Sequence, residues 1–294
     1  MYLTLNLCFH SFLLVMLIVD QSVLDDIGRG FSVPAQPTLL LEIFKLMAEV
    51  EPDSNAISRA ISKDIALSAA ILKTINSPRY GLNRTITDIK MSVNYIGVTG
   101  VVMLVTSSLL KKSFDPKDSS INLEDFWLFT SDIANAATLI GQRFKPNIAH
   151  DKFFSLGLFH ACGIPVMAMK YKNYQQLLDK ALTSPELSLN SLENKHYGVN
   201  HATVGYYVAS SWRIPRDVCQ IILQQHDKNF IKHATGKVEQ DLYAVLKLSE
   251  QLISLKYSDA DSAGWGDISR NVTRVLSIDD KQLALLSDEF TNSA

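Results

Sequence analysis

Residues 64–81, DIALSAAILKTINSPRYG, combine a helix with signals for both of its ends. Asp64 is a typical N-cap, because its carboxylate can accept hydrogen bonds from the free amides of the first turn. The apolar residues that follow recur at intervals of three and four: Leu67, Ala70, Ile71 and Ile75. This spacing indicates a helix with one face on a core. Turn residues dominate from Asn76 to Gly81, so we expect a loop there.

The same helical periodicity continues on both sides of this stretch. Before the segment 114–122 we expect helices at residues 39–50, 54–61 and 88–96, the last closed by Gly97, and a buried run at 101–110. After it we expect helices at residues 124–144, 151–171, 173–182, 189–197, 201–212, 216–226, 238–255, 265–275 and 279–290. Alternating patterns typical of strands are nearly absent. The sequence therefore predicts an all-α, multi-helix protein, and the polar stretch 114–122 marks its one boundary.

Composition excludes several classes of protein. The chain has 294 residues, of which 47% are hydrophobic and 20% charged, so it is too apolar to be disordered. Its 28 basic and 30 acidic residues leave a formal charge of -2, which disfavours a protein that coats nucleic acid. The three cysteines (Cys8, Cys162 and Cys219) lie far apart and form no CxxC pair. We therefore expect a reducing compartment, the cytoplasm, and no structural zinc site.

Residues 1–19 form an apolar N-terminal segment. A secretory signal needs a positive start, yet the first basic residue of the chain is Arg29. A membrane-spanning helix needs about 20 apolar residues, whereas this segment is shorter and carries Asn6 and His10. We interpret it as a buried helix or a misassigned start, and expect no membrane association.

Several motifs, taken in order along the chain, resemble the HDOD family, whose name means HD-related output domain. The helix and loop at 64–81 match its D-x-x-L-x-x-x-(I/L)-L and N-S-x-x-Y-G motifs, and residues 33–37 match its proline-rich lead. The second half adds Trp127, GLFH at 157–160, H-x-x-x-G at 201–205, W-x-I-P at 212–215, His226-Asp227 and LKLSE at 246–250. The resemblance covers about residues 33–255. It implies an N-terminal helical lobe (20–114) packed on a degenerate HD-like lobe with C-terminal helices (120–294).

The resemblance also bears on catalysis, because HD-type phosphohydrolases bind a divalent metal through a His, a His-Asp pair and a distant Asp. Such an ion lowers the pKa of its bound water so that the water can attack phosphate. Here the pair would be His160 and Ala161, the first His would fall at Phe129 or Thr130, and the distant Asp corresponds to Glu250. The motif is broken at Phe129 and Ala161, so we expect no enzyme activity and no cofactor.

Other donors leave an alternative open. A remnant of the metal site could use His160, Glu250, His226 and Asp227, with His196 and His201 as further candidates. For each histidine a structural role, bonded to protein, is the simpler interpretation. A metal-dependent phosphohydrolase and a nucleotide-binding sensor without turnover remain the alternative functions. DNA binding through the helix pair at 54–75 is disfavoured, because its turn lacks glycine and the chain is acidic.

The function that the resemblance implies is bacterial signal transduction. The chain would be a non-catalytic regulatory module that contacts a protein partner, with no nucleic acid partner. Asn76, Ser77, Tyr80 and Gly81 are the expected interaction loop, because a fixed polar turn between helices presents a rigid surface. A role in capping the helix end is the alternative for Asn76 and Ser77. The sequence specifies no oligomeric state.

Overall fold

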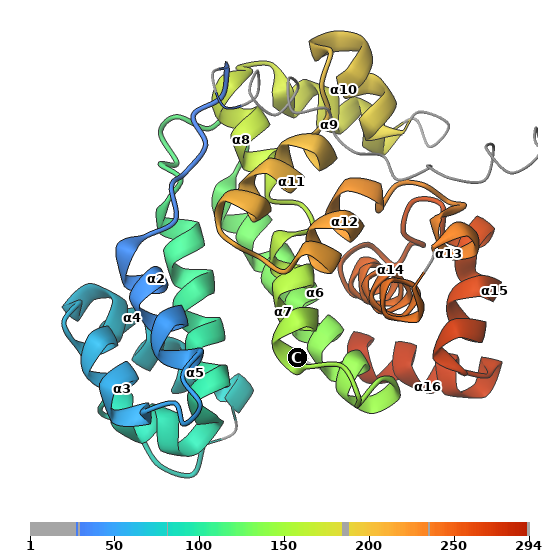
Figure 1. Cartoon of the computed structure of the whole chain (residues 1–294). Helices are drawn as coiled ribbons and strands as arrows, with labels where there is room; N and C mark the ends of the chain where they lie inside the picture. The colour runs from blue at the N-terminus through green and yellow to red at the C-terminus, as the bar shows by residue number, and fades with distance from the viewer. Residues whose placement is uncertain (1–27, 29, 81, 184–187, 235, 293–294) are drawn as a thin grey trace, which may run out of the picture.

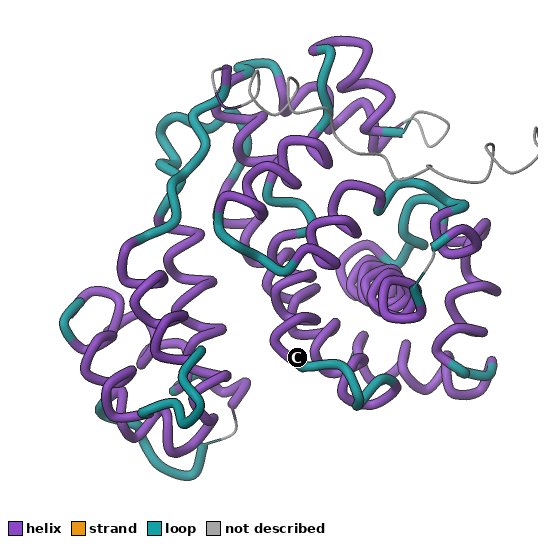
Figure 2. The backbone as a smooth tube through the Cα atoms, in the orientation of Figure 1, coloured by secondary structure: helices purple, strands orange, loops and turns teal. Residues whose placement is uncertain are grey.

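The computed structural model describes residues 28, 30–80, 82–183, 188–234 and 236–292. Helices joined by loops make up this part of the chain, and none of its residues lies in a β-strand (Figure 2). The all-α prediction is therefore confirmed. The apolar segment 1–19 and Gly81 lie outside the described residues.

The N-terminal lobe consists of the helices α2 to α5, which pack around an apolar centre (Figure 1). Their bounds are Thr38–Met47 for α2, Ser54–Ser62 for α3, Ile65–Ile75 for α4 and Ile89–Lys112 for α5, with a short 3-10 helix, η1, at Pro78–Tyr80. Three of these helices begin with an aspartate whose carboxylate accepts a first-turn amide: Asp53, Asp64 and Asp88. A cap of this kind typically contributes about 1 kcal/mol, and the N-cap prediction for Asp64 is confirmed.

Gly97 interrupts the helical geometry of α5. With φ 76° and ψ 166° it forms a kink between two helical stretches that together carry the label α5. The prediction of a helix closed by Gly97 is therefore confirmed, and the positive φ suits a glycine. The stretch after the kink buries Val101, Val105 and Leu110, as predicted for the run 101–110.

The C-terminal lobe surrounds one long helix, α14 (Lys237–Ser258), which is seen nearly end-on in Figure 1. The other helices are α6 (Leu123–Phe144), α7 (His150–Phe159), α8 (Gly163–Lys170), α9 (Tyr174–Thr183), α10 (Leu189–Tyr197), α11 (His201–Ser211), α12 (Arg216–Gln224), α13 (Phe230–His233), α15 (Trp265–Leu276) and α16 (Asp280–Thr291). α14 contacts α6, α7, α12, α13, α15 and α16. It is therefore a central helix, and it buries apolar side chains such as Leu242, Leu246 and Leu252 together with the polar Lys247, Ser249 and Gln251.

Where the sequence predicts one helix at 151–171, the structure has two, because the chain turns at residues 160–162 between α7 and α8. Gly163 lies so close to α11 that a Cβ there would be 2.0 Å from the His201 carbonyl oxygen. Pro165, in the first turn of α8, has no amide to continue the hydrogen bonds of α7. The break leaves the His160 carbonyl free to accept a side-chain amide of Gln225 at 2.6 Å.

Residues 31–37, which include the proline-rich lead 33–37, contact both lobes. Phe31 is buried, and Lys170 Nζ lies 3.9 Å from the centre of its ring. Trp212 Nε1 donates to the Pro34 carbonyl, and Gln36 Nε2 donates to the Trp212 carbonyl, each at 2.8 Å. The segment then enters α2, so one short stretch is bonded to the C-terminal lobe and continues into the N-terminal lobe (Figure 1).

Among the described residues, two helical stretches are long and apolar enough to cross a membrane by length and composition: Ile89–Lys112 and His150–Lys170. The second is α7 with α8, and 78% of its most apolar window is buried inside the protein. That degree of burial is typical of a core helix. The first is α5, in which 39% of the most apolar window is buried, and it packs on α3 and α4.

Candidate functional site

Three of the predicted candidate residues come from elements that pack on one another. His160 ends α7, His226 lies just after α12, and Glu250 is on α14, and these three helices are in mutual contact. Asp227 differs, because it is exposed and its carboxylate accepts the backbone amide of Asn229 at 2.9 Å in a surface turn. The fold thus gathers His160, His226 and Glu250 in one region.

The His160 side chain is buried, and one of its two ring nitrogens is hydrogen-bonded to the backbone. Its Nδ1 lies 2.7 Å from the Gly157 carbonyl oxygen, which can only accept, so Nδ1 carries the proton. Burial lowers the pKa of His160, partly opposed by the nearby Glu250 carboxylate and the Gly157 carbonyl. The ring is therefore neutral near pH 7, as the prediction of a hydrogen-bonded core histidine requires.

A positively charged side chain, Lys247, lies in this region. Its Nζ lies 2.8 Å from Glu250 Oε2, and only 10% and 19% of these two side chains is exposed. The ammonium charge acts on the rings of both His160 and His226 and lowers the pKa of each. Within the described part of the chain, no group of three or more His, Cys, Asp and Glu side chains is arranged to hold a metal ion. The cation that the structure places beside Glu250 is the Lys247 ammonium.

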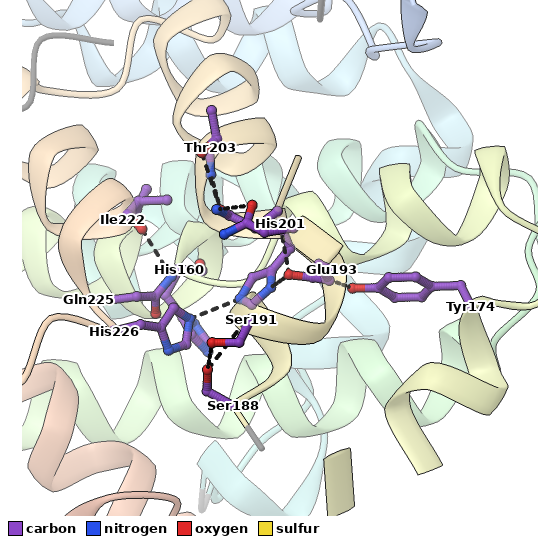
Figure 3. Close-up of polar contacts among 12 residues, drawn as sticks. His160, Tyr174, Ser188, Ser191, Glu193, His201, Thr203, Ile222, Gln225 and His226 are labelled. Carbon is purple, nitrogen blue, oxygen red and sulfur yellow. Dashed lines mark hydrogen bonds and ion pairs between the residues drawn. The ribbon is translucent and has the colours of Figure 1, made fainter. Parts of the chain in front are cut away.

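Beside this pair lies a chain of polar side chains from four elements (Figure 3). Glu193 on α10 is fully buried, and its Oε2 accepts from Nδ1 of His201 at 2.8 Å and from the His201 backbone amide at 3.1 Å. Its other oxygen accepts the Tyr174 hydroxyl of α9. On the far side, His201 Nε2 lies 2.9 Å from Nε2 of His226. The chain thus runs from a buried tyrosine to His226.

The two ends of this chain differ in environment. Burial and the Glu193 carboxylate raise the pKa of Tyr174, so its hydroxyl stays protonated and remains a donor. His226 is exposed to solvent, yet the protein around its ring lowers its pKa well below the usual value. Repulsion from His201, Lys247 and His160 adds to that effect. His226 is accordingly a neutral imidazole that solvent reaches and the protein orients.

The two broken motif positions have different surroundings. Phe129 is 37% exposed and its ring packs edge-on against Tyr257, with 5.7 Å between centroids. Thr130 is buried, and its hydroxyl has no hydrogen-bond partner among the described residues. Ala161 is buried in the turn after α7. None of the three side chains offers a nitrogen or carboxylate ligand.

In the predicted interaction loop, the Asn76 side chain bonds the end of α4 to residue 86, on the other side of the loop. Its side-chain amide donates to the carbonyls of Leu72 and Ile86 and accepts the Ile86 amide, each at 2.8 Å. Ser77 and Tyr80 are half-buried in the turn that it holds. Asn76 therefore shapes the loop. The interaction loop of Asn76, Ser77, Tyr80 and Gly81 stays a prediction, and Gly81 lies outside the described residues.

Sequence reasoning missed Tyr174, Glu193 and Lys247. Glu193 stands in the polar stretch LNSLENKHY, where nothing distinguishes a buried carboxylate from a solvated one. Lys247 could have been found, because it is a charge inside the run DLYAVLKLSE, whose other residues predict a central helix. A lysine there requires a partner, and Glu250 lies one turn later.

Comparison with known proteins supplies the family. The sequence profile of the HDOD domain matches residues 33–228. A curated protein of Treponema pallidum (strain Nichols), named as uncharacterized, is 24% identical over 195 residues, which are 66% of this chain and 38% of that protein. The chain therefore spans well under two thirds of that relative.

Several solved structures have the same fold. A candidate phosphohydrolase from Shewanella amazonensis SB2B superposes with a TM-score of 0.69 at 20% identity, covering 92% of this chain and 93% of that one. An HDOD domain protein with unknown function from Geobacter sulfurreducens gives 0.66 at 18% identity, with coverage of 92% and 97%. A candidate signal transduction protein from Marinobacter aquaeolei VT8 gives 0.68 at 17% identity, covering 91% and 58%. These identities establish a shared fold and no more.

Proposed function

The chain belongs to the HDOD domain family, and from this premise we propose that it is a non-catalytic regulatory module of bacterial signal transduction. It acts in the cytoplasm through contacts with a protein partner. The proposal rests on the HD-like region of the C-terminal lobe, where a hydrolase would need a metal ion and an open coordination position.

The observation that carries the proposal is the Lys247–Glu250 pair. The one carboxylate that the resemblance assigns to a metal already binds an ammonium at 2.8 Å, in a place that is mostly buried. A divalent ion would have to displace Lys247 and leave its charge unpaired, which is costly at a buried site. His160, the other assigned ligand, uses Nδ1 for the Gly157 carbonyl, which leaves only Nε2 for coordination. Both assigned ligands, Glu250 and His160, are therefore already bonded to groups of the protein itself.

A metal-dependent phosphohydrolase is the alternative that the naming of the Shewanella amazonensis structure favours. It would use His160, Glu250, His226 and Asp227. The exposed turn that holds Asp227, and the lysine at Glu250, both oppose it. A nucleotide-binding sensor without turnover is the third function, and it would need anion-binding groups such as the bases around His226.

Metal analysis of the purified chain separates these functions. We expect substoichiometric iron, manganese and zinc after dialysis, and no EDTA-sensitive hydrolysis of bis(p-nitrophenyl) phosphate. Stoichiometric metal with EDTA-sensitive turnover would establish the hydrolase instead. Calorimetry with mononucleotides and dinucleotides tests the sensor, for which the proposal predicts no heat of binding.

The contact role is tested at the loop. Ser77→Arg places a long charged side chain on the half-buried turn, so we expect it to abolish a partner interaction that the wild-type chain makes in its own host. Asn94→Arg, on an exposed position of α5, is the matched control and should keep the interaction. Equal recovery of the same partner by both variants would remove the loop from the contact surface.

A further inference from the structure

Glu193, His201 and His226 are arranged as an orienting acid, a base and a nucleophile. The Glu193 carboxylate holds Nδ1 of His201 at 2.8 Å, and Nε2 of His201 lies 2.9 Å from His226. A base within hydrogen-bond reach of a nucleophile, itself fixed by a third group, is the general pattern of nucleophilic catalysis in proteins. Nothing in the regulatory role proposed above requires this arrangement.

The hydrogen bonds fix which nitrogen faces which group. A carboxylate can only accept, so His201 carries a proton on Nδ1 and directs Nε2 toward His226. When His201 is neutral, its Nε2 accepts the proton on Nε2 of His226. That leaves Nδ1 of His226 with a free lone pair. The Tyr174 hydroxyl and the His201 backbone amide hold Glu193 in place, so the orientation is built in before any reagent binds.

The surroundings of His226 favour an anionic reagent. The residue is exposed to solvent. Lys247 is the permanently positive group that acts on its ring, and its ammonium binds Glu250 Oε2 at 2.8 Å. His160 is neutral, and His201 is neutral when it acts as the base, so neither adds positive charge. The adjacent Asp227 directs its carboxylate to the Asn229 amide. An ammonium near a reacting atom attracts and orients a phosphate.

We propose that Nδ1 of His226 is a nucleophile that accepts a phosphoryl group from an acyl phosphate, with His201 as the general base and Glu193 as the residue that positions it. The inference does not depend on the regulatory role, because it concerns one covalent step at one side chain. Phosphorylation would add negative charge beside Lys247 and so offers a way to alter this lobe.

The step balances without any other reagent. The lone pair of His226 Nδ1 attacks phosphorus, the N–P bond forms, and the P–O bond to the acyl group breaks. The carboxylate leaves with the electron pair of that bond. The proton on Nε2 of His226 passes to Nε2 of His201, where the Glu193 carboxylate stabilises the imidazolium, and His201 later releases it to solvent. The products are phosphohistidine, the carboxylate and one proton.

A purely structural role for the same contacts makes a different prediction. If the chain of hydrogen bonds only holds α10, α11 and the end of α12 together, His226 should react no faster than other exposed histidines. His196 and His233 are exposed and serve as internal references in the same molecule. Their rates need no variant, so the comparison does not depend on whether a substituted chain folds.

The experiment treats the full chain with acetyl phosphate and follows acid-labile, base-stable phosphate on each histidine by mass spectrometry and 31P NMR. We expect phosphate on His226 well before His196 or His233, and none at this position in His226→Gln. His201→Gln should slow the reaction at His226 by about 100-fold, the usual contribution of a general base, and should remove its rise in rate with pH. His196→Gln should leave the rate at His226 unchanged.

Two results would overturn the inference. One is an even distribution of phosphate over His196, His226 and His233, which would make His226 an ordinary imidazole. The other is an unchanged rate and pH profile in a folded His201→Gln chain, which would show that His201 gives no assistance. Circular dichroism confirms folding of each variant. Metal content and phosphodiester hydrolysis, which test the proposed function, are read separately in the same preparations.

Discussion

The N-terminal lobe, α2 to α5, and the C-terminal lobe, α6 to α16, bury different polar groups among the described residues. In the first they are the hydroxyls of Ser58, Ser92 and Thr106. In the second they include ionisable side chains: Asp132, His160, Glu193, His201, Asp241 and Lys247. The hydroxyls each donate to a carbonyl one helical turn earlier, at 2.7 to 3.1 Å. A hydroxyl of this kind needs no partner from another helix.

The buried charges of the C-terminal lobe depend mostly on partners that other elements bring. Glu193 meets His201 across the turn between α10 and α11, and Asp241 on α14 meets Lys145 at the end of α6, at 2.6 Å. A buried charge without its partner costs several kcal/mol. The core of the first lobe is therefore stabilised by packing of apolar side chains. The core of the second also requires that its helices bring oppositely charged side chains together.

The largest effect that this comparison predicts is at Glu193. Glu193→Ala should lower the free energy of unfolding by about 3–5 kcal/mol, because it leaves the buried His201 and Tyr174 groups without their acceptor. Urea unfolding followed by circular dichroism measures it. Glu49→Ala, at an exposed position of the N-terminal lobe, is the control and should change stability by less than about 0.5 kcal/mol. A loss below about 1 kcal/mol at Glu193 would mean that the lobe does not depend on this pair.

The features that sequence predicted are those fixed by local interactions. Asp64 caps α4 because its carboxylate bonds an amide three residues away, and the loop after α4 follows from Asn76, which bonds within ten residues. Spacing of apolar residues placed most helices, since each buries one face. Gly97 is a further local signal, because its positive φ breaks the helical geometry of α5 where the sequence predicts a helix end.

The candidate site was harder to predict from the sequence, because it depends on contacts between helices rather than on local interactions. His160, His226 and Glu250 could be named from motif positions, but the contact between Glu193 and His201 depends on the turn that joins two helices. The carbonyl of His160 became an acceptor for Gln225 only because α7 ends there. That break combines a close approach of Gly163 to α11, which is a tertiary contact, with Pro165, a helix-breaking residue that the sequence does show.

The pH dependence of stability offers a second test, because six of the seven histidines follow residue 114 and the seventh is His10. The pKa values of His160 and His226 are lower in the folded chain than the usual 6.5. Below that pH the unfolded chain binds protons that the folded chain does not, so stability is unaffected above it and falls as the pH drops through it. Thermal melts at about pH 7.5 and about pH 5.5 should show a lower Tm at the acid end.

Two variants test whether the lower Tm at acid pH arises in the C-terminal lobe. His160→Gln removes one of the shifted groups and should reduce the difference in Tm between the two pH values. His196→Gln, at an exposed position, should leave the difference unchanged. If His160→Gln keeps the full pH dependence, the buried imidazole is not its source, and the contrast between the lobes loses its electrostatic basis.

The smallest effect belongs to the charged contact between α2 and α3 in the N-terminal lobe. Lys63 Nζ lies 3.4 Å from Glu42 Oε1, and 73% and 48% of these side chains is exposed. Water screens such a pair, so a double-mutant cycle with Glu42→Ala and Lys63→Ala should give a coupling energy of less than about 1 kcal/mol. Added salt should reduce it further. The lobe is therefore expected to keep its stability without the pair, because its core residues Ile43 and Ile61 bury no charge. A coupling of several kcal/mol would instead show that α2 and α3 are also held by charge, and the two lobes would then differ in degree rather than in kind.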